Sequence, residues 1–148
     1  MKKILYLDLD GVLADFESGK KDLIEKGFDE SYIFKNLEGF FRDLPPIPGA
    51  IEAFEELSEF FNIFILSTAP WGNDSAWSDK AIWVKKYLGE KARKKLILSH
   101  RKDLNIGDFL VDDRLANGSE NFSGEHIHFG QVGFENWEKV KKYLLEKK

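Results

Sequence analysis

The sequence predicts an α/β fold in which a parallel sheet is covered by helices on both faces. The apolar runs at residues 4–7, 63–66 and 96–98 are short and uninterrupted, which is typical of strands buried on both faces. Segments with apolar residues at helical spacing alternate with these runs. The length of 148 residues fits one domain, residues 1–148.

The first predicted strand, residues 3–9, runs into Asp10-Gly11, a dipeptide that favours a turn. Residues 16–47 are irregular by comparison. They hold a weak helix, a break at Gly27 and an aromatic-rich stretch. The irregular part ends at the proline-rich residues 45–49, where we expect a rigid boundary.

A clear amphipathic helix begins near Ile51, because apolar residues recur there every three or four positions. Residues 61–67 form the second predicted strand. The next helix is expected to begin with Asp74 or Ser75 as its cap and to end at Gly89. The remaining predicted elements are strands at residues 95–98, 109–111 and 126–129 and a closing helix over residues 134–146.

The charge balance is 22 Lys and Arg against 26 Asp and Glu, a net charge of −4, which disfavours a dedicated nucleic-acid binder. The absence of cysteine excludes a disulfide framework and a thiolate zinc site. The apolar run after Lys3 stops at Asp8, too early for a signal peptide or a membrane span. We therefore expect a cytoplasmic protein with no membrane and no stable nucleic-acid partner, and its oligomeric state stays open.

Polar side chains that can carry chemistry occur at the ends of four predicted strands. Because the carboxyl ends of parallel strands meet at one edge of a sheet, these side chains are expected to share a crevice. An acidic residue at a strand end is by itself usually a turn or cap residue, but four successive strand ends with such groups favour a site. The residues are Asp8 and Asp10 on the first strand, Ser67 and Thr68 on the second, Lys102 after the third, and Asp112 and Asp113 after the fourth.

Four carboxylates in one crevice repel each other strongly unless a cation or protonation offsets their charge. Ligands that are all oxygen select a hard ion, and Mg²⁺ is the usual choice, often shared with a substrate phosphate. Lys102, Arg114 and backbone amides are the candidates to offset the remaining negative charge. The residues alone thus point to Mg²⁺ and a small phosphate ester.

The same residues carry a resemblance to a known family. Residues 8–16, Asp-Leu-Asp-Gly-Val-Leu-Ala-Asp-Phe, resemble motif I of the haloacid dehalogenase (HAD) superfamily of phosphohydrolases. Thr68, Lys102 and Asp112-Asp113 resemble its motifs II, III and IV, in the same order. Within the superfamily, the likeness is greatest to the 5′(3′)-deoxyribonucleotidases, on residues 10–16, 44–50, 67–70, 83–87 and 110–114. The implied organisation is one domain with a Rossmann-like core at residues 1–15 and 48–148 and a small helical cap at about residues 16–47.

The resemblance implies a phosphoric monoester hydrolase and assigns catalytic roles. Asp8 would be the nucleophile that forms an aspartyl-phosphate. Asp10 would protonate the leaving alcohol and then act as a base on the hydrolytic water. Thr68 would hydrogen-bond a phosphoryl oxygen, with Ser67 as the alternative, and Lys102 would neutralise the nucleophile and the phosphate.

The resemblance also implies the ligands of the Mg²⁺ ion. They would be the Asp8 side chain, the backbone carbonyl of Asp10 and Asp113, with Asp112 as a weaker or water-mediated partner. The sequence departs from the family at His100, where the family has arginine, and in its shorter cap. Both departures bear on the nucleoside preference rather than on the phosphatase chemistry.

Aromatic residues of the cap are candidates for contact with a nucleobase. Phe16 matches a family residue that contacts the base, and Phe40 and Phe41 match the paired cap aromatics. Trp71 is also placed to line the pocket. Aromatic faces stack on nucleobases, but a small cap also needs such residues for its own core, so both readings stay open.

Several functions fit these observations. The leading hypothesis is a Mg²⁺-dependent phosphomonoesterase that acts on deoxynucleoside 5′- or 3′-monophosphates. A second hypothesis keeps the chemistry but changes the substrate to another small phosphate ester or a nucleic-acid end phosphate. A different class is a receiver-like signalling module or a non-catalytic phosphate- or nucleotide-binding protein. The motif order disfavours a receiver, which has its phosphoacceptor after the third strand, where this chain has Lys102.

Overall fold

The computed structural model describes all 148 residues and contains a five-stranded parallel sheet with the strand order β3-β2-β1-β4-β5. β1 lies at the centre and pairs with β2 on one side and β4 on the other. The predicted α/β fold with a parallel sheet is confirmed. The strands are β1 (Lys3–Leu7), β2 (Phe61–Ser67), β3 (Leu96–Leu98), β4 (Phe109–Asp112) and β5 (Glu125–His128).

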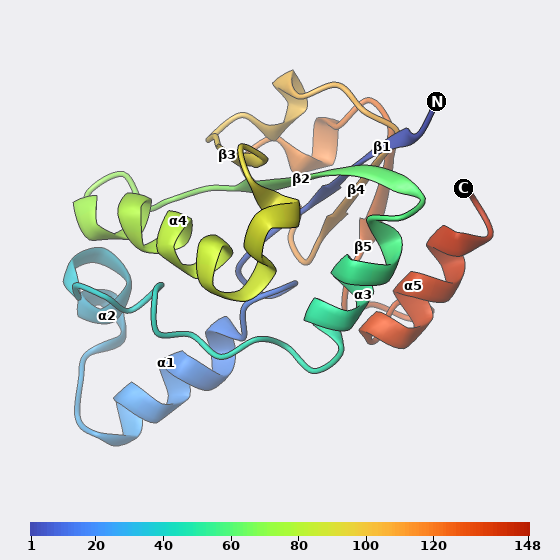
Figure 1. Cartoon of the computed structure of the whole chain (residues 1–148). Coiled ribbons are helices and arrows are strands. Elements are labelled where there is room, and N and C mark those ends of the chain that lie inside the picture. Colours follow the sequence, from blue (N-terminus) through green and yellow to red (C-terminus); the bar gives the residue numbers. More distant parts are fainter.

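Residues 1–15 and 48–148 are called the body below. One face of the sheet packs against the three longer helices of the body (Figure 1). Leu5, Ile63 and Val111 of the strands belong to the same cluster of 30 buried residues as Trp83 and Trp137 of the helices. These helices are α3 (Ala50–Leu57), α4 (Asp74–Leu88) and α5 (Trp137–Leu145). None of the helices is both long and apolar enough to span a lipid bilayer.

The opposite face is covered by single helical turns rather than by full helices. A crossover with an α-helix usually needs a dozen or more residues. The connection of residues 99–108 is shorter than this, and that of residues 113–124 only just reaches it. They contain only the 3-10 helices η2 (Lys102–Leu104) and η3 (Ser119–Asn121). A second, smaller buried cluster lies under them, formed by Tyr6, Leu66, Leu110 and Phe122.

Residues 16–47, called the insertion below, leave the body after β1 and return before α3. Asp29 caps the second of its two helices by accepting a hydrogen bond from the backbone N–H of Tyr32 at 3.2 Å. The two ends of the insertion lie side by side, because the N–H of Asp15 donates to the carbonyl of Pro45 at 2.7 Å. Figure 1 shows the insertion at the end of the molecule opposite to both termini. Its helices are α1 (Phe16–Glu25) and α2 (Glu30–Asn36).

The insertion shares its apolar core with the body. Ile33, Phe40, Phe41 and Leu44 are buried and belong to the same 30-residue cluster as the strands. The indole N–H of Trp83 in α4 donates to the carbonyl of Leu44 at 2.8 Å. The insertion is therefore packed as part of one unit with the sheet.

Candidate active site

A cavity of about 630 Å³ opens at the carboxyl ends of the strands, between the body and the insertion. The strand ends supply one wall, and α1 and α2 supply the other. The structure therefore brings together the residues that the sequence predicted for catalysis and metal binding. Those that line the cavity are Asp8, Asp10, Thr68, Lys102, Asp112 and Asp113, and Arg114, which was predicted to contact the substrate, lines it as well.

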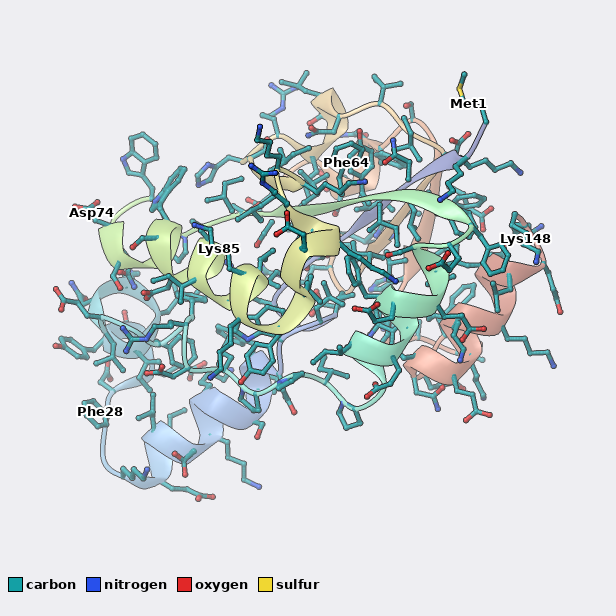
Figure 2. The ribbon with its side chains drawn as sticks, viewed as in Figure 1. Met1, Phe28, Phe64, Asp74, Lys85 and Lys148 are labelled. Atoms are coloured by element: carbon teal, nitrogen blue, oxygen red, sulfur yellow. The ribbon has the colours of Figure 1, made fainter.

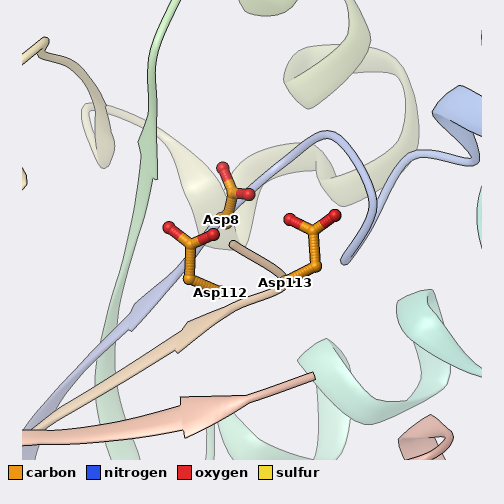
Figure 3. A group of neighbouring side chains, drawn as sticks. All are labelled: Asp8, Asp112 and Asp113. Atoms are coloured by element: carbon orange, nitrogen blue, oxygen red, sulfur yellow. The ribbon is translucent and has the colours of Figure 1, made fainter. Parts of the chain in front are cut away.

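Three carboxylates converge where β1 and β4 end. Figure 3 shows the side chains of Asp8, Asp112 and Asp113 gathered at this point, and one oxygen of each lies within 4.8 Å of the others. The strands are neighbours in the sheet, and the N–H of Asp8 still donates to the carbonyl of Val111 at 2.9 Å. Pairing of the two strands thus fixes the spacing of the carboxylates.

Gly11 makes room for this group of carboxylates. Its backbone has a φ of +84°, a conformation that favours glycine. A Cβ atom at this position would lie 2.1 Å from Oδ2 of Asp113. Glycine is thus required at position 11 for two reasons: the backbone has a positive φ, and the carboxylate of Asp113 occupies the space of a Cβ atom.

Burial and crowding shift the pKa values of the two acidic residues after β4. Burial, reinforced by the negative charge of Asp8, raises the pKa of Asp112 to about 7 and that of Asp113 to about 8. Both oxygens of Asp112 have partners, because Lys102 Nζ donates to one at 2.6 Å and the N–H of Arg114 to the other at 3.0 Å. Oδ1 of Asp113 is buried and has no hydrogen-bond partner. A divalent cation would supply that partner and favour the ionised carboxylate, so the donor set fits a hard ion.

Lys102 lies beside the predicted nucleophile. Its buried Nζ is 3.1 Å from Oδ1 of Asp8 and 2.6 Å from Oδ2 of Asp112. Burial lowers the pKa of Lys102, but the two carboxylates outweigh this effect and hold it above its ordinary value. The ammonium group is therefore charged at neutral pH. Arg114, which is exposed on the cavity wall, forms no ion pair and is free to contact an anion.

Asp10 has a different partner, Lys80 in the middle of α4. Lys80 is fully buried, and its Nζ also donates to the hydroxyl of Ser67 at 3.0 Å. Burial raises the pKa of Asp10, and the charge of Lys80 opposes this rise without cancelling it. Oδ1 of Asp10 is buried without a partner. The cavity thus contains a carboxyl group that binds its proton more tightly than usual.

Lys80 was missed by the sequence reasoning, although a signal for it exists. Ala76, Lys80, Trp83 and Val84 lie on one face of α4, and all four are buried. A lysine on the buried face of a helix requires a buried partner of opposite charge. The residue pattern therefore predicts a buried ion pair of Lys80, but it does not identify Asp10 as the partner.

The two hydroxyl residues after β2 have different surroundings. Thr68 lines the cavity, and its Oγ1 donates to the carbonyl of Ser99 at 2.7 Å, which ties the loop after β2 to the loop after β3. Ser67 is buried, is absent from the cavity wall, and its hydroxyl accepts the bond from Lys80. This corrects the expectation that Ser67 is an alternative contact for the substrate.

The aromatic residues expected to contact the substrate divide into two groups. Phe16 and Trp71 line the cavity, as does Phe34, which was not singled out. Phe40 and Phe41 are only 4% and 2% exposed and lie outside the cavity wall. They pack against Phe16, with ring centroids 5.5 and 6.2 Å away. Of the two interpretations left open for Phe40 and Phe41, the structure supports packing: both belong to the core shared by the insertion and the body, and their expected contact with the substrate is corrected.

Comparisons with known proteins point to one family. The family model described as 5′ nucleotidase, deoxy (pyrimidine), cytosolic type C protein matches residues 27–142. A candidate 5′(3′)-deoxyribonucleotidase of Vibrio phage KVP40 is 48% identical over 150 residues, which cover 97% of this chain and 85% of the phage protein. The human cytosolic-type 5′(3′)-deoxyribonucleotidase is 30% identical over 155 residues, which cover 83% of this chain and 77% of the human protein.

Solved structures agree on the fold. A candidate HAD hydrolase from Bacillus subtilis, crystallised with magnesium, matches with a TM-score of 0.67 and 10% identity, over 97% of this chain and 98% of that one. A haloacid dehalogenase-like hydrolase from Streptococcus pneumoniae matches with a TM-score of 0.61 and 14% identity, over 96% and 90% of the two chains. At these identities the likeness establishes a HAD-type architecture.

Proposed function

Because the chain belongs to the 5′ nucleotidase, deoxy (pyrimidine), cytosolic type C family, we propose that it hydrolyses deoxynucleoside monophosphates to deoxynucleosides and orthophosphate. It is a phosphoric monoester hydrolase of the HAD type. One observation carries the chemistry: Asp8 lies in the cavity wall with a charged Lys102 on one side and the carboxyl group of Asp113 on the other. The name of the human relative supports a cytosolic location.

Asp8 and Asp10 share the first chemical step. A carboxylate oxygen of Asp8 attacks phosphorus, and the bond between phosphorus and the ester oxygen breaks. Asp10 donates its proton to the leaving oxygen, a role that suits a carboxyl group whose pKa is raised by burial. The products of this step are a deoxynucleoside and a phosphorylated Asp8.

Water completes the reaction. Asp10, now ionised, accepts a proton from a water molecule that attacks phosphorus, and the bond between phosphorus and Asp8 breaks. Lys80 supports this second role, because its positive charge stabilises the ionised form of Asp10. Orthophosphate leaves, and both aspartates return to their starting states.

We propose that Mg²⁺ is the divalent ion of this site. The carboxylates of Asp8 and Asp113 and the backbone carbonyl of Asp10 would hold it. Asp112 would be the weaker partner, because both of its oxygens already accept hydrogen bonds. The unpartnered buried oxygen of Asp113 supports the assignment. When bound, Mg²⁺ neutralises charge on the phosphoryl group and on the carboxylates.

The phosphoryl oxygens would contact three groups of the chain. Lys102 contributes a fixed positive charge next to Asp8. Thr68 lines the cavity at the end of β2, and its hydroxyl would donate to a phosphoryl oxygen after releasing the carbonyl of Ser99. Arg114 is unpaired at the wall. Such preorganised donors stabilise the charge that develops in the transition state and supply most of the rate in phosphoryl transfer.

The insertion, residues 16–47, acts as the cap over a core formed by residues 1–15 and 48–148. Phe16 and Phe34 give its wall an apolar surface, with ring centroids 6.2 Å apart. A sugar and a base can lie against such a surface, while the phosphate faces the charged residues on the opposite wall. The insertion's wall also carries the charged Glu17, Lys20 and Glu30, and its aromatic part supports a nucleotide substrate.

Phosphate release from a panel of esters tests the proposal. The panel contains deoxy- and ribonucleotides, their 5′ and 3′ isomers, sugar phosphates and a 3′-phosphorylated oligonucleotide, each with Mg²⁺ and with EDTA. We expect Mg²⁺-dependent release that is fastest from deoxynucleotides and absent in Asp8→Asn. Fastest release from sugar phosphates would keep the mechanism and refute the substrate, and no release by folded protein would refute both.

A further inference from the structure

The strand β5 carries two histidines, His126 and His128, on one face of the sheet. Side chains alternate along a strand, so Ile127 between them points to the opposite face, where it is buried in the 30-residue cluster. The two imidazole rings are neighbours, with centroids 5.4 Å apart. Neither residue lines the catalytic cavity, so direct contact with the substrate is not their role.

His128 contacts the main chain of a residue in the group of three carboxylates. In the ladder between β4 and β5, His128 lies opposite Asp112, and the N–H of Phe129 donates to the carbonyl of Asp112 at 3.0 Å. Asp113 is the first residue beyond β4. The Nε2 atom of His128 lies 3.0 Å from the carbonyl oxygen of Asp113. Because a carbonyl oxygen can only accept, Nε2 carries the hydrogen and donates it.

The hydrogen bond from His128 fixes the main chain from which the Asp113 carboxylate extends. It is the one hydrogen bond that holds the main chain of Asp113. The carbonyl carbon and the side chain are attached to the same Cα, and the side chain reaches the neighbouring carboxylates (Figure 3). Oδ1 of this side chain is buried and accepts no hydrogen bond from the protein. The direction of the carboxylate therefore depends on the main chain, and through it on His128.

Resting on the Mg²⁺ site of the proposed function, we propose that His128 is a positioning residue that holds the Asp113 carboxylate in the orientation that binds the ion. Mg²⁺ demands nearly ideal octahedral geometry, so a displaced ligand weakens its binding. Residues that hold the ligands of a metal in place typically contribute about ten- to hundredfold to its affinity. The neutral ring and the protonated ring can both donate from Nε2, so the contact does not depend on the charge of His128.

His126 provides a matched comparison on the same strand. It lies two residues earlier, on the same face, opposite Leu110 of β4. Its Nε2 is buried and has no hydrogen-bond partner. His126 therefore shares the residue type and the face of His128 but lacks its bond to the loop after β4.

Calorimetry of Mg²⁺ binding without substrate tests the inference. His128→Phe keeps a ring but removes the donor, and we expect about a tenfold loss of Mg²⁺ affinity. His128→Gln carries an amide N–H as many bonds from Cβ as Nε2 of the imidazole is, and it should restore most of the affinity. His126→Phe makes the same change of residue without loss of a hydrogen bond, and it should bind Mg²⁺ as the wild type does. Melting temperatures in EDTA show that each variant is folded.

Three results of the calorimetry would overturn the inference. The first is an unchanged affinity in His128→Phe. The second is a loss in His128→Gln as large as that in His128→Phe, because the donor would then not matter. The third is an equal loss in His126→Phe, which would assign the effect to packing at the end of β5.

Nitrogen NMR of the wild-type protein tests the contact itself. The chain has three histidines, and spectra of His126→Phe and His128→Gln assign their signals by difference. Nε2 of His128 should carry a hydrogen, and its signal should move when Mg²⁺ is added, whereas that of His126 should stay nearly fixed. An Nε2 of His128 without hydrogen, or a signal that ignores Mg²⁺, would contradict the proposed role.

Phosphate release separates this inference from the proposed function. Excess Mg²⁺ should bring the rate of His128→Phe back toward that of the wild type, with a half-maximal Mg²⁺ concentration raised about tenfold. If the wild type released phosphate from no ester but calorimetry ordered the variants as expected, the proposed function would fail and His128 would keep its role. Active variants of equal Mg²⁺ affinity would refute only the role of His128. Wild-type protein that bound no Mg²⁺ would refute the metal site and the role of His128 together.

Discussion

Asp10 and Lys80 form an ion pair inside the protein that joins the turn after β1 to the middle of α4. The lysine is fully buried, and the second oxygen of the aspartate has no partner. Burial raises the pKa of Asp10, and Lys80 limits the rise. The lysine therefore sets the pH at which the proposed general acid loses its proton.

Lys80→Met should shift the pH profile of kcat/KM to higher pH. Without the positive charge, Asp10 keeps its proton to higher pH, and we expect a displacement of about one pH unit or more. Lys85→Met is the matched control, because Lys85 is exposed on the same helix (Figure 2). A profile that coincides with the wild type would show that Lys80 has only a structural role.

Asp8→Asn should abolish phosphate release while the protein stays folded. The amide cannot form the covalent intermediate, so we expect a loss of at least about 10⁴-fold, on the scale of removing a catalytic nucleophile. The melting temperature of the metal-free protein should not fall, because the substitution removes a negative charge that faces Asp112 and Asp113, and Lys102 keeps Asp112 as its charged partner. Activity within a hundredfold of the wild type would exclude Asp8 as the nucleophile.

The metal-free protein should lose stability as the pH rises from about 4 to about 8. The pKa of Asp113 is about 8 in the folded chain and near its ordinary 3.8 in the unfolded chain, so the folded state binds more protons in this range. Stability is therefore greatest below the lower value and is lost as the pH passes the higher one. Melting temperatures in EDTA at pH 5 and pH 8.5 measure this loss.

Asp113→Asn isolates the contribution of this one group. The decrease in melting temperature between the two pH values should be smaller than in the wild type by roughly 3 °C or more. Mg²⁺ at pH 8 should raise the melting temperature of the wild type but not that of Asp113→Asn. Parallel curves for the two proteins would contradict the raised pKa of Asp113.

Gly11→Ala should weaken Mg²⁺ binding, because the new Cβ would displace the carboxylate of Asp113. We expect at least about a tenfold loss of Mg²⁺ affinity, read from calorimetry without substrate. Gly27→Ala is the control: Gly27 has a φ of +97° with nothing within 4 Å of its Cβ position, so it bears similar backbone strain without the contact. An equal loss in both variants would mean that strain alone is responsible.

Phe41→Ala should affect stability rather than substrate choice. The ring is buried in the shared core, and its removal should cost about 3–5 kcal/mol of unfolding free energy. Denaturant unfolding measures this cost. The ratio of KM values for dTMP and an aryl phosphate should stay at the wild-type value. A selective rise in KM for dTMP would return Phe41 to the substrate wall.

Much of the fold follows from local patterns in the sequence. The five strands were predictable to within one or two residues, because uninterrupted apolar runs between turn residues have few other interpretations. α2 was missed because only Ile33 of its seven residues is buried, so no apolar stripe marks it. The single-turn helices η2 and η3 on the second face could not be predicted from apolar periodicity, because they form where the connections are too short for an α-helix.

The candidate site was predictable where chemistry and strand ends coincide. Asp8, Thr68, Lys102 and Asp113 all lie at one edge because parallel strands end there. The pairing of Asp10 with Lys80 depends on the packing of α4 over the strand ends, which residue spacing does not determine. The burial of Phe41 likewise depends on how the insertion folds back on the body.

The shared core of the insertion and the body also constrains how this enzyme can diversify. Removal of residues 16–47 would strip Ile33, Phe40, Phe41 and Leu44 from the cluster that contains the strands and leave the indole of Trp83 without its acceptor. The insertion is therefore not an exchangeable module, and a graft from a relative would have to carry a matching interior. New substrate preferences are more accessible through point substitutions on the cavity-facing surface, such as Phe16 and Phe34, than through recombination of whole segments.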